Sequence, residues 1–112
     1  MNKIFSIPTV NNKLSPHFGH CEAFAIVKVE NDKIQNTKFL TPPAHQPGVY
    51  PAFLKENNVD IILAGGMGSR AISLFNSHGI KVEIGVDSED PVTLVENYLK
   101  GNLKTGENAC DH

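Results

Sequence analysis

The chain has 112 residues, of which 40% are hydrophobic and 20% charged, and its formal net charge is -2. This length and balance predict one globular domain and exclude a chain too highly charged to form a core. Nucleic acid and membrane-surface partners are not expected, because both kinds of binding need clustered positive charge and the Lys and Arg residues here are scattered singly.

The sequence also gives expectations about location. No run approaches the roughly 20 apolar residues of a membrane span, and the first residues enter a strand pattern without the features of an export segment. We therefore expect a cytoplasmic protein. Cys21 and Cys110 are expected as free thiols or as thiolates on a metal, since structural disulfides belong to oxidising compartments.

The first part of the chain predicts three strands. Residues 3–8 are rich in β-branched and aromatic side chains and reach Pro8, which cannot donate to a ladder, so the first strand is expected to stop there. Residues 24–30 and 33–40 flank an Asn-Asp pair that tolerates positive φ. They predict an antiparallel hairpin with a tight turn.

The rest of the chain predicts alternating helices and strands after a loop at 41–48 that holds three prolines. Asp90 and Pro91 supply an N-cap and a first residue for the last helix, and Gly101 ends it. From residue 102 onward there is no periodicity, so we expect one domain over 1–101 and a flexible tail over 102–112. The other predicted elements are a helix over 49–57, a strand over 59–64, a helix over 69–78 and a strand over 80–84.

The order βββαβαβα predicts an α/β domain, a three-layer fold similar to ribonuclease H, with a mixed five-stranded sheet and helices on its faces. Nuclease activity is not expected, because that chemistry needs carboxylates around divalent metals and the first strand offers Ser6 instead of an Asp. Ser15 and His17 do not form a nucleophile and base either, since no orienting acid is apparent. We therefore expect a protein that is not an enzyme.

The segment after the first strand predicts a metal-handling loop. It places His17, His20 and Cys21 beside Pro16 and Gly19, and imidazoles and thiols are ligands of soft and borderline metals. The alternative is that His17 covers the sheet edge, His20 is solvated and Cys21 is a small buried hydrophobic residue. The sequence leaves both interpretations open.

Further candidate ligands lie elsewhere in the chain. Cys110 and His112 form a Cys-x-His pair in the tail that can swing onto an open coordination position, although a solvated end of the chain is the alternative. His45 lies in the proline-rich loop and is available as another ligand. His78 suits the C-terminal end of a helix and is left out of the site.

A glycine turn, Gly65-Gly66-Met67-Gly68, connects a predicted strand to a predicted helix. Its free backbone N–H groups suit an anion such as phosphate or a negatively charged metal-sulfide cluster. The turn lacks the lysine and hydroxyl pattern of a P-loop and the acidic residue of a dinucleotide fingerprint. Tight packing of strand against helix is the other explanation for these glycines.

Two separated motifs give a family resemblance. The segments 15–19 and 64–71, with Phe24 and residues 79–82, closely resemble the dinitrogenase iron-molybdenum cofactor-binding family, which includes NifX-like and NafY-like carriers, the carboxyl-terminal part of NifB-like proteins and small stand-alone proteins. The resemblance covers about residues 1–101. It implies a ribonuclease H-like fold that carries or transfers a metal-sulfur cofactor without performing turnover.

The resemblance also implies site residues. His17 matches the histidine of the family's His-Phe-Gly motif, and the three glycines of the glycine turn match the family's turn. His20 and Cys21 fall where relatives often carry other residues, and the Cys-Asp-His tail occurs only in some relatives, so the bound species is left open.

From this resemblance we expect a carrier of an iron-sulfur or iron-molybdenum-sulfur cofactor in metallocluster biosynthesis or delivery, and the isolated protein need not contain the cofactor. Its expected partners are metallocluster donor and acceptor proteins, and its expected state is a monomer or weak homodimer. The alternative is a metal-independent regulatory or partner-binding module that uses the glycine turn as an anion or protein contact.

Overall fold

The computed structural model describes residues 2–16, 18–44 and 48–106, and for His20 it describes the backbone alone. The sheet has the strand order β4-β3-β1-β5-β6, and a short strand, β2, pairs with β1. The elements in chain order are β1 (Lys3–Val10), β2 (Lys13–Leu14), the 3-10 turn η1 (Phe18–His20), β3 (Ala23–Glu30), β4 (Lys33–Leu40), α1 (Val49–Glu56), β5 (Ile61–Leu63), α2 (Ser69–Ser77), β6 (Lys81–Glu83) and α3 (Pro91–Leu99).

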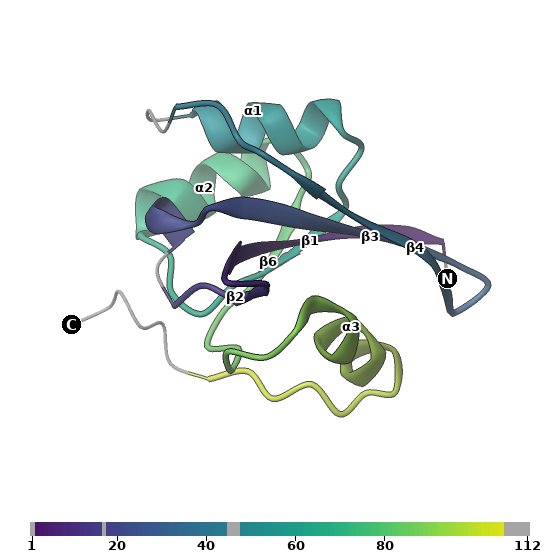
Figure 1. Ribbon diagram of the computed structural model, residues 1–112. Coiled ribbons are helices and arrows are strands. Elements are labelled where there is room, and N and C mark those ends of the chain that lie inside the picture. The colour runs from purple at the N-terminus through teal and green to yellow at the C-terminus, as the bar shows by residue number, and fades with distance from the viewer. Residues whose placement is uncertain (1, 17, 45–47, 107–112) are drawn as a thin grey trace.

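The helices cover both faces of the sheet. Figure 1 shows α1 and α2 on one face and α3 on the other. Because successive side chains of a strand point to opposite faces, Phe24 and Ile26 of β3 pack towards α1 and α2, and Ala25 and Val27 pack towards α3. The predicted three-layer α/β fold with a mixed sheet is confirmed.

The strand directions determine which edge of the sheet can hold a ligand site. β1, β3 and β4 are antiparallel, and β5 and β6 run parallel to β1. The carboxyl ends of parallel strands meet at one edge of a sheet, where open α/β sheets bind their ligands. Here residues 11–16, 18–22, 64–68 and 84–90 meet at this edge, which we call the carboxyl edge.

The turn between β3 and β4 confirms the predicted hairpin. Asn31 and Asp32 have φ values of 53° and 62°, the left-handed conformation that a tight two-residue turn requires at both positions.

The prediction that the first strand stops at Pro8 was wrong, because β1 continues to Val10. The Pro8 carbonyl accepts a hydrogen bond from the Ser15 N–H at 2.8 Å. The nitrogen and carbonyl of one strand residue point to the same side, so the donor that proline lacks would face away from β3. On that side β5 pairs with β1 only as far as Ser6, and Pro8 instead faces Ser15 beside the short strand β2, so the missing N–H interrupts neither β3 nor β5.

The helix ends follow from local chemistry. The Asp90 carboxylate accepts a hydrogen bond from the Thr93 N–H at 3.1 Å and so caps α3, as predicted. Gly79 and Gly101 follow the ends of α2 and α3 with φ values of 75° and 74°. Among the described residues, no helix combines the length and apolar character that crossing a membrane requires.

The first residues of the predicted tail contact the domain. Leu103 packs against the hydrophobic cluster on the α3 face, and the Gly106 N–H donates to the Ile84 carbonyl at 3.3 Å. Residues 107–112 lie outside the described part of the chain, and the flexibility of the tail stays a prediction.

Candidate functional site

The two motifs that carry the family resemblance meet at the carboxyl edge. The Phe18 N–H donates to the Gly66 carbonyl at 3.4 Å. A Cβ atom on Gly65 would lie 3.3 Å from Leu14 Cδ2 and 3.4 Å from Pro16 Cα. The loop after β1 therefore packs directly on the turn after β5, although the two are far apart in sequence.

The glycine turn has a buried part and an exposed part. Gly65, Gly66 and Met67 are buried, and Gly68 is exposed at the start of α2. The Gly65 carbonyl also accepts a hydrogen bond from the Gly85 N–H at 3.0 Å. Close packing accounts for the glycine at position 65, because a side chain there would press on the neighbouring loop. The anion-binding role of the turn stays a prediction.

Among the predicted metal ligands, Cys21 is the one whose side chain the structure describes. His20 ends the 3-10 turn η1, and its side chain is not described. The described residues contain no group of three or more His, Cys, Asp or Glu side chains able to hold a metal ion. The other predicted ligands lie outside the described residues: His17, His45, Cys110 and His112. Their roles stay predictions.

The Cys21 thiol is half-buried against the cluster that contains Tyr50, and the Tyr50 hydroxyl is its hydrogen-bond partner. Burial raises the pKa of Cys21 to about 11, and hydrogen bonds from its own backbone and from Tyr50 act in the opposite direction. The thiol is therefore protonated at neutral pH. A metal that binds there must displace this proton, since the thiolate is the ligand form.

Tyr50 is the site residue that the sequence analysis missed. It lies in the first turn of α1 with 4% of its surface exposed. Its ring meets Phe18 edge to face at 5.3 Å and Phe24 at 5.1 Å between centroids. Burial and the neighbouring Cys21 raise the pKa of Tyr50. The sequence contains no motif that links this tyrosine to Cys21, because the contact depends on how α1 packs on the sheet.

The chain that follows Cys21 is held to β1. The Glu22 N–H donates to the Thr9 carbonyl at 2.8 Å, and the Thr9 hydroxyl donates to the Ala23 carbonyl at 3.0 Å. The Asn11 N–H donates to Glu22 Oε1 at 2.9 Å. These bonds fix where the loop enters β3, so the backbone beside Cys21 has a defined position.

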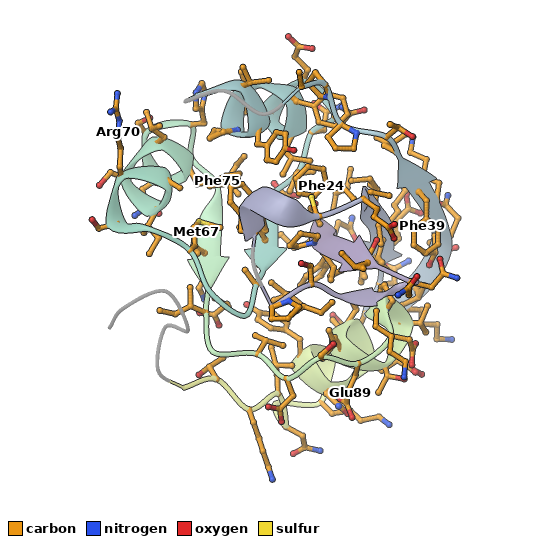
Figure 2. All side chains as sticks on the ribbon, turned by 60° about the vertical axis from the view of Figure 1, so that its left-hand side comes forward. Phe24, Phe39, Met67, Arg70, Phe75 and Glu89 are labelled. Carbon is orange, nitrogen blue, oxygen red and sulfur yellow. The ribbon has the colours of Figure 1, made fainter. Side chains whose placement is uncertain are left out.

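Four rings form an aromatic cluster beside this loop: Phe18, Phe24, Tyr50 and Phe75. Figure 2 shows Phe24 and Phe75 between the sheet and the helices, while Arg70 points outward from α2. Phe18 is only 6% exposed. The phenylalanine of the His-Phe-Gly motif is therefore a core residue that anchors the loop.

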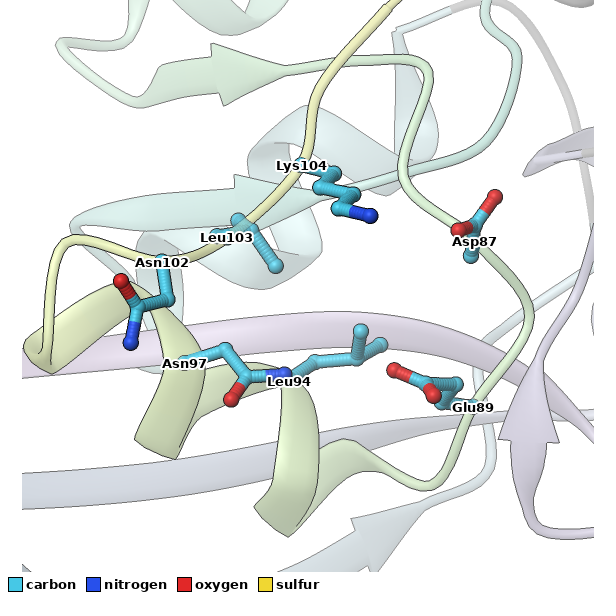
Figure 3. Close-up of a pocket in the computed structure, with 7 residues that line it drawn as sticks. All are labelled: Asp87, Glu89, Leu94, Asn97, Asn102, Leu103 and Lys104. Carbon is cyan, nitrogen blue, oxygen red and sulfur yellow. The ribbon is translucent and has the colours of Figure 1, made fainter.

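A separate cavity lies between α3, the loop before it and residues 102–104 (Figure 3). Its lining includes the exposed carboxylates Asp87 and Glu89, and the Lys104 side chain points toward Asp87. Of the predicted site residues that the structure describes, none lines this cavity. Asp87 and Glu89 belong to the 84–90 segment of the carboxyl edge, and the rest of the lining comes from α3 and the residues after it.

The fold and the meeting of the two motifs define a class of small α/β proteins with a His-Phe-Gly loop packed on a glycine turn. The sequence profile of the dinitrogenase iron-molybdenum cofactor family matches residues 1–101. The chain belongs to this family. It is 40% identical over 108 residues to the uncharacterized protein MJ0580 of Methanocaldococcus jannaschii, an alignment that covers 91% of this chain and 90% of that protein.

Solved structures share the fold. The crystal structure of PH0822 superposes with a TM-score of 0.87 at 29% sequence identity and covers 97% of this chain and 99% of its own. The apo form of the orange protein from Desulfovibrio gigas superposes with a TM-score of 0.76 at 17% identity and covers 96% of each chain. At that identity the second comparison establishes the fold alone.

Proposed function

We propose that this protein binds an iron-sulfur or iron-molybdenum-sulfur cluster as cargo at the carboxyl edge and passes it from a donor protein to an acceptor protein. The observation that carries the proposal is the contact of Phe18 with Gly66, which joins the two family motifs beside the Cys21 thiol. Family membership supports a cofactor-binding role. Binding and release require no turnover, and free thiols suit the cytoplasm as the compartment.

The donor set suits such a cargo. A Cys21 thiolate with the imidazoles of His17 and His20 offers sulfur and nitrogen ligands, which iron and metal-sulfur clusters accept. His45 is a further candidate because it adjoins the described loop at 41–44. The glycine turn would contribute backbone N–H groups at the amino end of α2, where negative charge is favoured.

The tail is the second source of ligands. The described chain ends at Gly106, which is bonded to Ile84 at the carboxyl edge. Cys110 follows four residues later and His112 six. An extended chain spans about 3.5 Å per residue, so four residues beyond Gly106 allow a reach of up to roughly 14 Å. The length of this segment is compatible with Cys110 and His112 completing the coordination of a cluster at the same edge.

The test is anaerobic reconstitution with ferrous iron and sulfide, with and without molybdate, followed by desalting, metal and sulfide analysis, and visible spectroscopy. Wild-type protein is expected to retain a cluster. Cys21→Ala and His17→Ala are expected to retain at most about a tenth as much, in line with the loss of a ligand. His78→Ala, at the carboxyl end of α2, is the matched histidine control and is expected to behave as wild type. Equal retention by wild type and Cys21→Ala would contradict the proposal.

A metal-independent regulatory or partner-binding module is the second candidate. The raised pKa of Cys21 favours it, since a metal that binds there must displace a more tightly held proton than in an ordinary thiol. In this role the glycine turn contacts an anion or a protein. Unchanged anion or partner affinity in Gly66→Val would exclude it.

A further inference from the structure

Resting on the proposed function, we infer that Tyr50 is a positioning residue for the cluster: its hydroxyl donates a hydrogen bond to the Cys21 sulfur and strengthens the hold of that sulfur on the metal. Nothing in the family motifs includes this tyrosine. The inference assigns a role to a side chain on α1, an element that contributes none of the motif residues.

Packing fixes the ring of Tyr50, and its hydroxyl is a hydrogen-bond partner of Cys21, which packs against the same cluster. Phe18 and Phe24 both meet the ring nearly at right angles, with interplanar angles of 86° and 88°. A phenylalanine ring would make the same contacts, so the hydroxyl is not needed for packing. A buried hydroxyl does need a hydrogen-bond partner, and the Cys21 sulfur is one.

The sulfur is presented to this hydroxyl by a loop that is tied down on both sides. Before Cys21, the Phe18 N–H is bonded to Gly66, and after it, the Glu22 N–H is bonded to Thr9. Tyr50 comes from the helix above the sheet, so two independent elements set the separation of hydroxyl and sulfur. When the thiol proton leaves on metal binding, the Tyr50 O–H is still a donor to the thiolate.

Hydrogen bonds of this kind have two measurable effects. Partners that orient a metal ligand typically change metal affinity by about 10- to 100-fold when removed. Hydrogen bonds to cluster sulfurs also set the reduction potential, because they stabilise the more negatively charged, reduced state. A purely structural role for Tyr50 would affect stability but not the potential.

The experiment compares Tyr50→Phe with Tyr98→Phe, since the chain has just these two tyrosines. Tyr98 is a matched control because its ring packs edge to face on Phe5 at 5.1 Å, on the opposite face of the sheet. Each protein is reconstituted with ferrous iron and sulfide, and the rate of iron release to a chelator and the midpoint potential are measured. Tyr50→Phe is expected to release iron about tenfold faster, with a more negative midpoint potential, while Tyr98→Phe matches wild type.

A second variant covers the case in which Tyr50→Phe folds poorly. In the Tyr98→Phe background Tyr50 is the sole tyrosine, and biosynthetic incorporation of fluorotyrosine makes its hydroxyl a stronger donor. The midpoint potential should then move to more positive values.

The outcomes separate the two proposals. If wild type and Tyr50→Phe have the same release rate and the same potential while Cys21→Ala loses the cluster, the role of Tyr50 is overturned and the carrier function stands. If Cys21→Ala retains as much cluster as wild type, the carrier site at Cys21 is wrong and the role of Tyr50 falls with it.

Discussion

The two faces of the sheet differ in how they are built. On the α1–α2 face, rings from four separate segments meet in the aromatic cluster, next to Cys21 and the glycine turn. On the α3 face the buried side chains are mainly aliphatic, together with the ring pair of Phe5 and Tyr98. The face that holds the candidate site therefore depends on contacts between distant segments, and the other face depends on ordinary strand alternation.

The helices show the same contrast. The N-cap residues of α1 and α2 are Gly48 and Gly68, which supply no side-chain cap, whereas the Asp90 side chain caps α3. Local sequence accordingly determines where α3 begins. The start of α2 instead follows from the packing of the glycine turn against the loop after β1.

The largest expected effect tests whether the motif phenylalanine belongs to the core. Phe18→Ala is expected to lower the free energy of unfolding by about 3–5 kcal/mol, because Phe18 contacts three rings of the aromatic cluster. Phe39→Ala, on edge strand β4 with 47% of Phe39 exposed (Figure 2), is expected to change it by less than about 0.5 kcal/mol. Urea denaturation followed by circular dichroism measures both. Similar losses in the two variants would remove the contrast between the faces.

Removal of the two buried hydroxyls on β1 is expected to change the free energy of unfolding in opposite directions. The Ser6 hydroxyl is fully buried and has no hydrogen-bond partner among the described residues, so Ser6→Ala is expected to stabilise the fold by about 1 kcal/mol. Thr9 donates to the Ala23 carbonyl, and the near-isosteric Thr9→Val is expected to destabilise it by about 1 kcal/mol. Both changes are measured as shifts of the urea midpoint. A destabilised Ser6→Ala would mean that its hydroxyl has a partner.

A third prediction concerns the cap of α3, whose contribution to stability depends on pH. Asp90→Ala is expected to lower the free energy of unfolding by about 1 kcal/mol at pH 7. Hydrogen bonds from the Thr93 hydroxyl and N–H lower the pKa of Asp90 in the folded state. The charge-dependent part of the stabilisation is therefore complete above the unfolded pKa and is lost as the pH falls through the folded pKa.

The matched control is Asp90→Asn, which can still cap the helix but does not titrate at this position. The stability difference between wild type and Asp90→Asn should shift in favour of the variant as the pH falls from 5 towards 2. A difference that stays constant over this range would show that the Asp90 charge contributes nothing.

Local sequence determined most of the secondary structure of this protein. The Asn-Asp turn, the Asp90 cap and the glycines after α2 and α3 act through the conformations and hydrogen bonds of a few adjacent residues, and these features are visible in one sequence. The continuation of strand β1 past Pro8 was not predictable from adjacent residues. Whether a proline fits a strand depends on which neighbour lies on the side of its nitrogen, and pairing is decided by the whole sheet.

The candidate site also has features that the sequence identified and features that only the packing of the chain decided. The sequence by itself identified the loop with His17, His20 and Cys21 and the glycine turn, because chemically distinctive residues are concentrated there. That Phe18 is buried against Gly66, and that Tyr50 reaches Cys21, was decided only when α1, α2 and the carboxyl ends of β1 and β5 packed together. Contacts between distant segments leave no periodic pattern in the sequence. Their physical cause is the burial of aromatic rings in one cluster, and that cluster exists only in the tertiary structure.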